Sequence, residues 1–277
     1  MIRWLTPPKL LEVAKYVDCY WYLDKPTGGY NRPKLNPDPS AHLILSSPNQ
    51  TYQYEMNDDV FKGKGSHWLY PHSNTIELNH AKSFACIGIK FKVGALYSLN
   101  NVTFTQALLN TVNTLNLEIF NGAACGCEDE LLLKANNDPD KCIEILDKIF
   151  LPLVANCYED KHSEITRKTL MLLTDMPINR LSEMLFCSQR TLERSYLKVT
   201  GFTLKQCQSM NKLEAILEYL YQRKQCDIDW VDIAYQFGFS DQPHLIRYLK
   251  QYINLTPKKY AQQRGFTIDV YGGVESK

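Results

Sequence analysis

A repeat near the C-terminal end of the chain constrains its fold most strongly. The first copy is "LSEMLFCSQRTLERSYLKVTGFTLKQC" (181–207), and the second is "IAYQFGFSDQPHLIRYLKQYINLTPKKY" (233–260). Three positions match between the copies: Leu181 with Ile233, Ser188 with Ser240, and Arg194 with Arg247. The second copy has one extra residue between its Ser and its Arg. A repeated segment of this length predicts one supersecondary unit used twice.

Each copy predicts two helices joined by a tight turn, with a Ser as the N-cap of the second helix. Gly201 and Asn254 follow that helix, and both residue types tolerate the left-handed conformation of a helix C-cap. Thr203 and Thr256 then begin the next helix. The residues between the copies, 204–224, carry apolar side chains at helical spacing and predict one connecting helix. The sequence therefore predicts two helix-turn-helix units on a common helical linker.

Length and charge suggest two domains with different partners. The chain has 277 residues and 44% hydrophobic content, which is enough for a buried core in each of two domains. Its 31 basic and 30 acidic residues nearly balance, but from Leu170 onward there are 14 Lys and Arg against 11 Asp and Glu. This mild basic excess is compatible with a polyanionic partner without requiring one.

The N-terminal residues "MIRWLTPPKLLEVAKYV" lack the apolar core of a signal peptide, and we expect no membrane span. The nine cysteines are therefore interpreted as reduced thiols of a cytoplasmic protein. Cys125 and Cys127 form the only close pair, and their spacing is not that of a standard zinc site.

The first hundred residues predict a mostly antiparallel β-unit. Residues 8–24 begin as a helix and end as an aromatic strand, and residues 25–40 are rich in Pro, Gly and Asn, which predicts a loop. Short β-branched or aromatic runs then predict strands at 42–46, 51–56, 66–70, 74–79 and 84–91.

After Gly94 the pattern changes to short helices, in segments such as "ALYSLNN", "FTQALLN", "LNLEIFNG" and "EDELLLKAN". Residues 138–160 predict one longer helix that begins at Asp138 and is kinked or broken at Pro152. Its apolar stripe is either core of its own domain or a dimer seam: Ile143, Leu146, Phe150 and Val154.

Residues 165–264 resemble the DNA-binding domain of AraC/XylS-type transcription regulators. The second copy carries that family's signature almost letter for letter. The first copy departs from it in having Phe186 where a turn Gly is usual, and Leu204 where Pro is usual. Lys212 and Ile216 also stand where the family's connecting helix has Arg and Ala. Residues 5–100 resemble, more loosely, the sensory domains of a subset of the family, through the "YVDCYWYL" and "NPDPSAHLIL" segments.

The resemblance implies an α+β chain with three parts. Residues 1–137 would form an effector or regulatory domain, 138–163 a linker and dimerisation helix, and 164–277 a DNA-binding domain with two helix-turn-helix units. The implied partners are double-stranded DNA, a second copy of the chain, a small-molecule effector and, for an activator, RNA polymerase. The implied location is the bacterial cytoplasm, at the nucleoid.

In a helix-turn-helix unit, the exposed side chains of the second helix contact base edges in the major groove. The candidates for base contacts are Gln189, Arg190, Thr191, Glu193 and Arg194 in the first unit, and Gln242, Pro243, His244, Ile246 and Arg247 in the second. Arg suits guanine, Gln suits adenine, Glu suits cytosine, and apolar groups suit thymine methyls. The candidates for phosphate contacts are Lys198, Lys250 and Lys258. For any single side chain, the alternative is an ordinary solvated helix face.

Other functions have less support in the sequence. We find no phosphate-binding loop, nucleophile elbow or zincin pattern, so we expect neither catalysis nor a cofactor. The histidines of the β-unit do not have the spacing of a metal site: His42, His67, His72 and His80.

The candidate lining of an effector pocket is Trp21, Tyr22, His42, Tyr54, Trp68 and Tyr70, for which ordinary core packing is the alternative. Two other functions stay open: an adaptor or anti-regulator that kept the fold without binding DNA, and a metal- or thiol-dependent enzyme.

Overall fold

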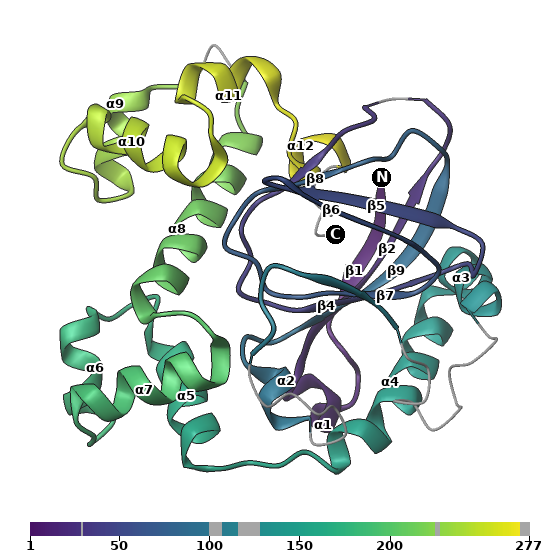
Figure 1. Cartoon of the computed structure of the whole chain (residues 1–277), viewed down its shortest axis with the longest axis horizontal. Coiled ribbons are helices and arrows are strands. Elements are labelled where there is room, and N and C mark those ends of the chain that lie inside the picture. Colours follow the sequence, from purple (N-terminus) through teal and green to yellow (C-terminus); the bar gives the residue numbers. More distant parts are fainter. Residues whose placement is uncertain (29, 100–106, 116–127, 225–227, 272–277) are drawn as a thin grey trace.

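The computed structural model describes residues 1–277 except 29, 100–106, 116–127, 225–227 and 272–277. The N-terminal residues form two β-sheets with helices packed against them, and the C-terminal residues form helices only (Figure 1). The predicted α+β fold is therefore confirmed. Cys125 and Cys127 lie outside the described residues.

The larger sheet has six strands in the order β1-β2-β9-β4-β7-β10, and the smaller has four in the order β3-β8-β5-β6. The larger sheet consists of β1 (Ile2–Thr6), β2 (Val17–Lys25), β4 (His42–Ser46), β7 (His67–Leu69), β9 (Phe84–Phe91) and β10 (Val112–Thr114). The smaller consists of β3 (Lys34–Leu35), β5 (Thr51–Met56), β6 (Asp59–Lys64) and β8 (Ile76–Leu78). Every pairing between these strands is antiparallel, as predicted.

The predicted strands at 42–46, 51–56 and 84–91 have the predicted bounds, while β7 and β8 are shorter than expected. The strands β1, β3, β6 and β10 were not predicted, and β3 lies within residues 25–40, which were expected to be a loop. Strand β6, "DVFKGK", is short of β-branched residues and forms because it closes a hairpin with β5 through Asn57, whose φ is 53°. Residues 107–110, part of one expected helix, form no helix.

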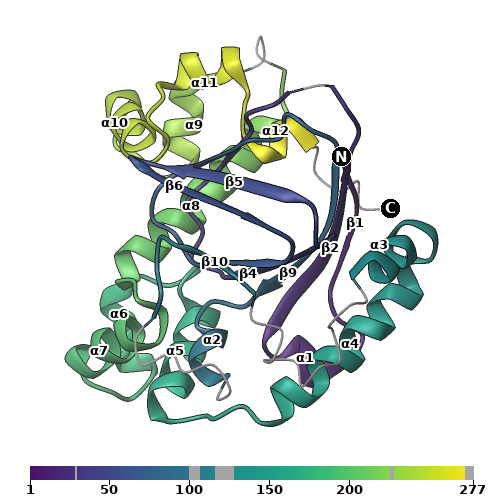
Figure 2. The same cartoon turned by 45° about the vertical axis from the view of Figure 1, so that its right-hand side comes forward.

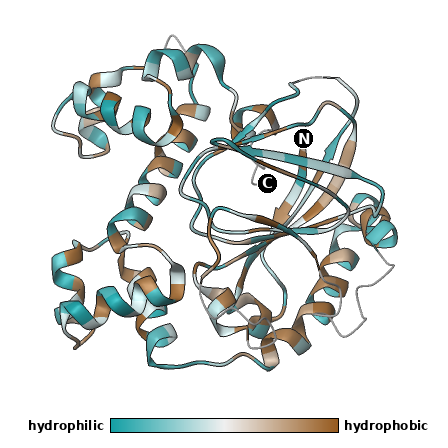
Figure 3. Cartoon of the chain, viewed as in Figure 1, coloured by the Kyte–Doolittle hydropathy of each residue, from teal (hydrophilic) through white to brown (hydrophobic). Residues whose placement is uncertain are grey.

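Helices α1 (Leu11–Ala14), α3 (Glu128–Asn137) and α4 (Pro139–Ala155) cover one face of the larger sheet (Figures 1 and 2). Their apolar residues and those of β2, β4 and β9 form the main core of this part of the chain. In Figure 3, α4 alternates between hydrophobic and hydrophilic residues, as an amphipathic helix does. The remaining helix of this part is α2 (Ala95–Ser98).

The apolar stripe on α4 belongs to this core. Ile143, Leu146, Phe150 and Val154 are at most 5% exposed within the single chain. They therefore cannot also be a dimer seam, and α4 is part of the N-terminal domain rather than a linker. Asp138 caps the helix by accepting from the backbone N–H of Lys141, as predicted. Of the kink or break expected at Pro152, the break does not occur: α4 continues through this residue to Ala155, and Pro152 lies in the last turn, where few backbone hydrogen bonds depend on it.

The C-terminal helices repeat the predicted pattern: α5 (Lys161–Leu172), α6 (Ile178–Met184), α7 (Gln189–Thr200), α8 (Leu204–Tyr221), α9 (Trp230–Gln236), α10 (Gln242–Ile253), α11 (Pro257–Gln263) and α12 (Thr267–Tyr271). The connecting helix α8 runs between the two units (Figure 1). No helix among the described residues is long and apolar enough to cross a bilayer.

The caps of the two units match each other. Gly201 and Asn254 are left-handed C-caps with φ of 76° and 55°, and Thr203 and Thr256 are N-caps, all as predicted. The N-cap of α10 is Asp241 rather than the predicted Ser240. The carboxylate of Asp241 accepts from the N–H of His244 at 2.7 Å, so the extra residue of the second copy supplies the cap.

Candidate nucleic-acid interface

The first unit consists of α6 and α7, joined by residues 185–188. Ser188 caps α7 by accepting from the N–H of Thr191. Leu192 and Tyr196 are fully buried beneath the helix, as predicted. Arg190, Glu193 and Arg194 are exposed, and Gln189 and Thr191 are half-buried. Burial of the opposite face thus points the predicted base-contacting residues of α7 outward.

The second unit consists of α9 and α10. Leu245 and Leu249 are fully buried, and Tyr248 is half-buried. The predicted base-contacting residues are again on the other side: Pro243, His244 and Arg247 are exposed, and Gln242 and Ile246 are half-buried. The imidazole of His244 packs edge-on against Phe239, with ring centroids 5.1 Å apart, which restricts its orientation.

The cationic side chains on these faces differ in whether a carboxylate of the same chain already pairs with them. Within the described residues, Arg190, Arg194, Arg247, Lys250 and Lys258 form no ion pair. Lys198 is different, because its Nζ lies 3.9 Å from Asp160 Oδ2 and 5.4 Å from the ring centre of Tyr97. The other cations are free to meet an anionic partner, whereas Lys198 contacts the N-terminal domain.

Glu193 also has a partner within its own helix. The side-chain amide of Gln189 donates to Glu193 Oε1 at 2.8 Å. These two residues lie one turn apart on the exposed face of α7. A cytosine contact by Glu193 would therefore compete with, or share, this hydrogen bond.

Helix α8 holds the two units together. It begins with a capping box in which Thr203 accepts from Gln206 N–H and the Gln206 side chain accepts from Thr203 N–H. Further along, Tyr248 of α10 donates to the backbone oxygen of Ser209, and the ammonium of Lys212 lies 3.8 Å from the ring centre of Phe239. These contacts fix α10 on α8, so the connecting helix sets the distance between the units.

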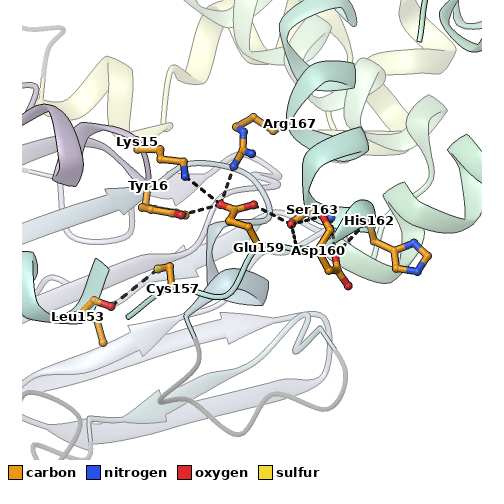
Figure 4. Close-up of polar contacts among 9 residues, drawn as sticks. All are labelled: Lys15, Tyr16, Leu153, Cys157, Glu159, Asp160, His162, Ser163 and Arg167. Carbon is orange, nitrogen blue, oxygen red and sulfur yellow. Dashed lines mark hydrogen bonds and ion pairs between the residues drawn. The ribbon is translucent and has the colours of Figure 1, made fainter. Parts of the chain in front are cut away.

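A hydrogen-bonded cluster around Glu159 joins α5, which packs against α7 of the first unit, to the N-terminal domain (Figure 4). Glu159 Oε1 accepts from Tyr16 Oη at 2.6 Å and from Arg167 Nη1 at 2.7 Å. Ser163, on α5, donates to Glu159 Oε2 at 2.8 Å, and Lys15 Nζ lies 3.5 Å from Oε1. Burial opposes the ionised form, but the hydrogen bonds from Tyr16, Arg167 and Ser163 outweigh it and lower the pKa of Glu159 to about 2.

Close backbone contacts reinforce this junction. A Cβ at Gly94, which precedes α2, would lie 2.7 Å from Val199 Cγ1, so only glycine lets α7 approach there. Gly94 also has a φ of 77°, which disfavours any other residue. Nothing in the local sequence indicates this contact or the Glu159 cluster, because the partners lie far apart in the chain.

The second unit touches the N-terminal domain at separate points. Thr75 Oγ1 donates to the backbone oxygen of Tyr252, in α10, at 2.9 Å. The N–H of Lys34, in β3, donates to the backbone oxygen of Gly265 at 2.8 Å. Both units are therefore docked on the N-terminal domain, one at each end of α8.

A cavity of about 1870 Å³ lies between the β-sheets and α8. Its lining includes Trp21, His42 and Tyr54 of the predicted effector pocket, together with Glu214 and Tyr221 of α8. The other predicted pocket residues do not line it: Tyr22, Trp68 and Tyr70 are at most 4% exposed and belong to the core beneath the larger sheet. The alternation of side chains along β2 explains the separation of Trp21 from Tyr22.

A chain of charged groups crosses this cavity from the sheet to α8. Lys90 Nζ lies 3.4 Å from Asp38 Oδ2 and 3.8 Å from Glu214 Oε1. Asp38 Oδ2 also lies 3.1 Å from His42 Nε2. Burial raises the pKa of Asp38, but Lys90 and His42 outweigh this effect and hold its pKa well below the usual range. The charge on Lys90 is thus shared between the two parts of the chain.

The remaining histidines each have their own contacts. His67 lies 2.7 Å from Tyr54 Oη and 2.9 Å from the backbone oxygen of Gly65, and burial lowers its pKa to about 4. The Nδ1 of His72 lies 2.8 Å from the backbone oxygen of Asn74, and the ring of His80 packs against that of Phe84 at an interplanar angle of 50°. Within the described residues, no three His, Cys, Asp or Glu side chains gather as a metal site would require.

Comparison with known proteins gives two family matches. Residues 181–263 match a family described as a helix-turn-helix domain. Residues 5–112 match a domain of unknown function (DUF6597). No curated protein matches the chain significantly.

Several solved structures are similar to the chain at low sequence identity. ToxT from Vibrio cholerae O395 is 10% identical with a TM-score of 0.46, and the match covers 88% of this chain and 97% of that one. Unsaturated fatty acid-bound ToxT from V. cholerae strain SCE256 is 13% identical with a TM-score of 0.43, covering 90% and 94%. The C-terminal domain of AraT, a response regulator from Geobacillus stearothermophilus, is 18% identical with a TM-score of 0.34, covering 39% and 92%.

The helix-turn-helix match spans both copies of the repeat, and each copy folds with matched caps and an outward-facing second helix. Residues 181–263 therefore form a helix-turn-helix domain that contains both units, as expected for the DNA-binding domain of an AraC/XylS-type transcription regulator, and a separate N-terminal domain precedes it.

Proposed function

We propose that α7 and α10 read two neighbouring segments of the major groove on one face of a DNA site. The observation that carries this proposal is the matched pair of exposed helix faces, with two arginines on α7 and one on α10 that have no ion-pair partner in the described residues. Arg190 and Arg194 in the first unit, and Arg247 in the second, suit guanine. Lys250 and Lys258 suit phosphates.

Selection of binding sites from random double-stranded DNA tests this proposal. The full chain is expected to enrich one sequence with two conserved segments about one helical turn apart. Arg194→Ala should relax the base preference within one segment, and Arg247→Ala should relax it within the other. Lys141→Ala, at an exposed residue of α4 in the N-terminal domain, is the matched control and should leave both unchanged. Failure to enrich any sequence would contradict the proposal.

The adaptor or anti-regulator alternative would require one unit to have lost its DNA-binding face. The first unit departs from the family pattern at Phe186 and Leu204, yet it retains the capped recognition helix and its exposed arginines. This geometry favours DNA binding. An adaptor would bind no DNA preferentially, so the same selection separates the two functions.

We also propose that the cavity between the sheets and α8 binds a small-molecule effector. Its lining combines aromatic side chains such as Trp21 and Tyr54 with the charged groups Asp38, Lys90 and Glu214. An effector that contacts Lys90 would compete for the charge that holds Glu214, and would thereby change how α8 sits on the sheets. Such differential binding is what a ligand-driven switch requires.

A thermal-shift screen of small metabolites tests the cavity. A true effector should raise the melting temperature because it binds the folded chain. Trp21→Ala should abolish the shift. Tyr22→Phe, the next residue on the opposite face of β2, should retain it. A shift that persists in Trp21→Ala would place the ligand elsewhere.

Pairing of two chains on one operator is a further proposal. The modest basic excess of the DNA-binding domain limits the affinity of a single copy, and a second copy would double the phosphate contacts. Since the α4 stripe is buried, another surface would have to pair the chains. Sedimentation at micromolar concentration, with and without DNA, measures this directly.

As a regulator of transcription, the protein would act at the nucleoid in the cytoplasm and, as an activator, would contact RNA polymerase.

A further inference from the structure

The turn of the first helix-turn-helix unit contains an unusual residue. Phe186 has a φ of 51°, in the left-handed region that favours glycine. The equivalent residue in the second unit is Gly238, with a φ of 67°. Equivalent backbone hydrogen bonds close the two turns. In the first unit Cys187 N–H donates to Ser182 O, and in the second unit Phe239 N–H donates to Ala234 O. A side chain at this position therefore costs conformational free energy that glycine would avoid.

No contact within the described part of the chain compensates for this cost. The side chain of Phe186 is 97% exposed, the most exposed large hydrophobic residue among those described. An exposed aromatic ring at a strained backbone position adds no stability to the free chain, and it contributes binding free energy only when a partner covers it.

The location of the ring identifies that partner. Phe186 lies two residues before Ser188, the N-cap of the helix that carries Arg190 and Arg194. It borders a groove of about 350 Å³ whose lining also includes Lys161, Lys168 and Thr191. Lys168 pairs with Glu164 at 2.7 Å, whereas Lys161 forms no ion pair in the described residues. Because the N-terminal residues of a recognition helix contact base edges, the turn that precedes α7 lies near the DNA when α7 is in the major groove.

We infer that Phe186 is an additional DNA-contacting residue, whose phenyl ring packs on the deoxyribose and base edge of a nucleotide next to those read by α7. Phenylalanine makes apolar contacts of this kind with DNA. This inference rests on the proposed DNA-binding function of α7. It assigns the first unit a contact that Gly238 cannot make in the second unit.

The test compares Phe186→Asn and Phe186→Gly with the wild type on the selected DNA site. Both replacements tolerate the left-handed backbone, so neither should lower the melting temperature, and glycine should raise it. We expect each to weaken DNA binding about five- to tenfold, as loss of a partly buried aromatic contact would. Because no phosphate contact is lost, the slope of log affinity on log salt should stay unchanged.

Leu133→Asn, at an exposed apolar residue of α3, is the matched control and should bind like the wild type. A photoreactive benzoylphenylalanine at position 186 should cross-link to DNA. Unchanged affinity of both Phe186 variants would overturn the inference. A cross-link only to protein in a complete transcription mixture would also overturn it, in favour of a protein-docking surface. A wild type that binds no site preferentially would instead refute the underlying proposed function.

Discussion

Replacing Glu159 by Gln tests whether the cluster at the domain junction stabilises the fold through its charge. Glutamine keeps the shape of the side chain and can still accept from Tyr16, but it removes the charge that attracts Arg167 and Lys15. A fall in pKa from 4.5 to about 2 corresponds to about 3 kcal/mol of stability at neutral pH. Arg167 and Lys15 are 40% and 46% exposed, so we expect solvent screening to reduce this effect to about 2 kcal/mol.

The stability difference between the wild type and Glu159→Gln should depend on pH. The folded-state pKa of Glu159 is below its ordinary value of 4.5, so its contribution is fully present above that value. The contribution is lost as the pH falls through about 2. The stability difference between the wild type and Glu159→Gln should therefore be largest at pH 7 and shrink steadily below pH about 4.5.

Urea unfolding of the full chain at several pH values measures this difference. Glu164→Gln is the control, since Glu164 pairs with Lys168 at a site where both side chains are more than half exposed, and its effect should be smaller. Tyr16→Phe should cost more stability in the wild type than in Glu159→Gln, because the Tyr16 hydroxyl donates to a charged carboxylate only in the wild type. A stability difference that stayed constant from pH 7 to pH 3 would refute the assignment of Glu159 as the charged centre of the junction.

Arg247→Ala is expected to weaken binding to the selected DNA site by about 1–3 kcal/mol and to relax preference at one position, as measured by titration against single-base variants. Unchanged preference would contradict a base contact. Lys258→Ala should weaken binding to all sequences alike and lower the salt slope by about one. Lys198→Ala should leave that slope unchanged, because Lys198 already contacts Asp160, and a lower slope would show that the contact opens on DNA. Leu146→Glu places a carboxylate in the core and is expected to unfold the N-terminal domain, seen as loss of near-ultraviolet circular dichroism, and a folded variant would disprove the burial of this residue.

The helical part of the chain could be predicted from sequence because its signals are local. Ser188, Thr203 and Thr256 are N-caps, and Gly201 and Asn254 are left-handed C-caps, as the residue types indicate. The one misplaced cap, Ser240 for Asp241, arose because two adjacent residues can both cap a helix. The outward faces of α7 and α10 followed directly from the helical period.

Features that depend on distant residues could not be predicted. An apolar stripe such as Leu146 and Phe150 has the same pattern whether it packs on its own sheet or on a second chain. The aromatic residues Trp21 and Tyr22 differ in function only because the cavity lies on one face of β2. Lys198 was expected to contact phosphate because it is a cation on α7, and its partner Asp160 becomes a neighbour only in the folded chain.

Hydroxyl-radical footprinting of the full chain on its selected site tests the central claim most directly. The account predicts two protected segments on one face of the DNA, about 34 Å apart. Arg194→Ala should weaken protection of one segment only, and Arg247→Ala protection of the other only. A single protected segment that both substitutions weaken equally would contradict the claim that two units of one chain read DNA side by side.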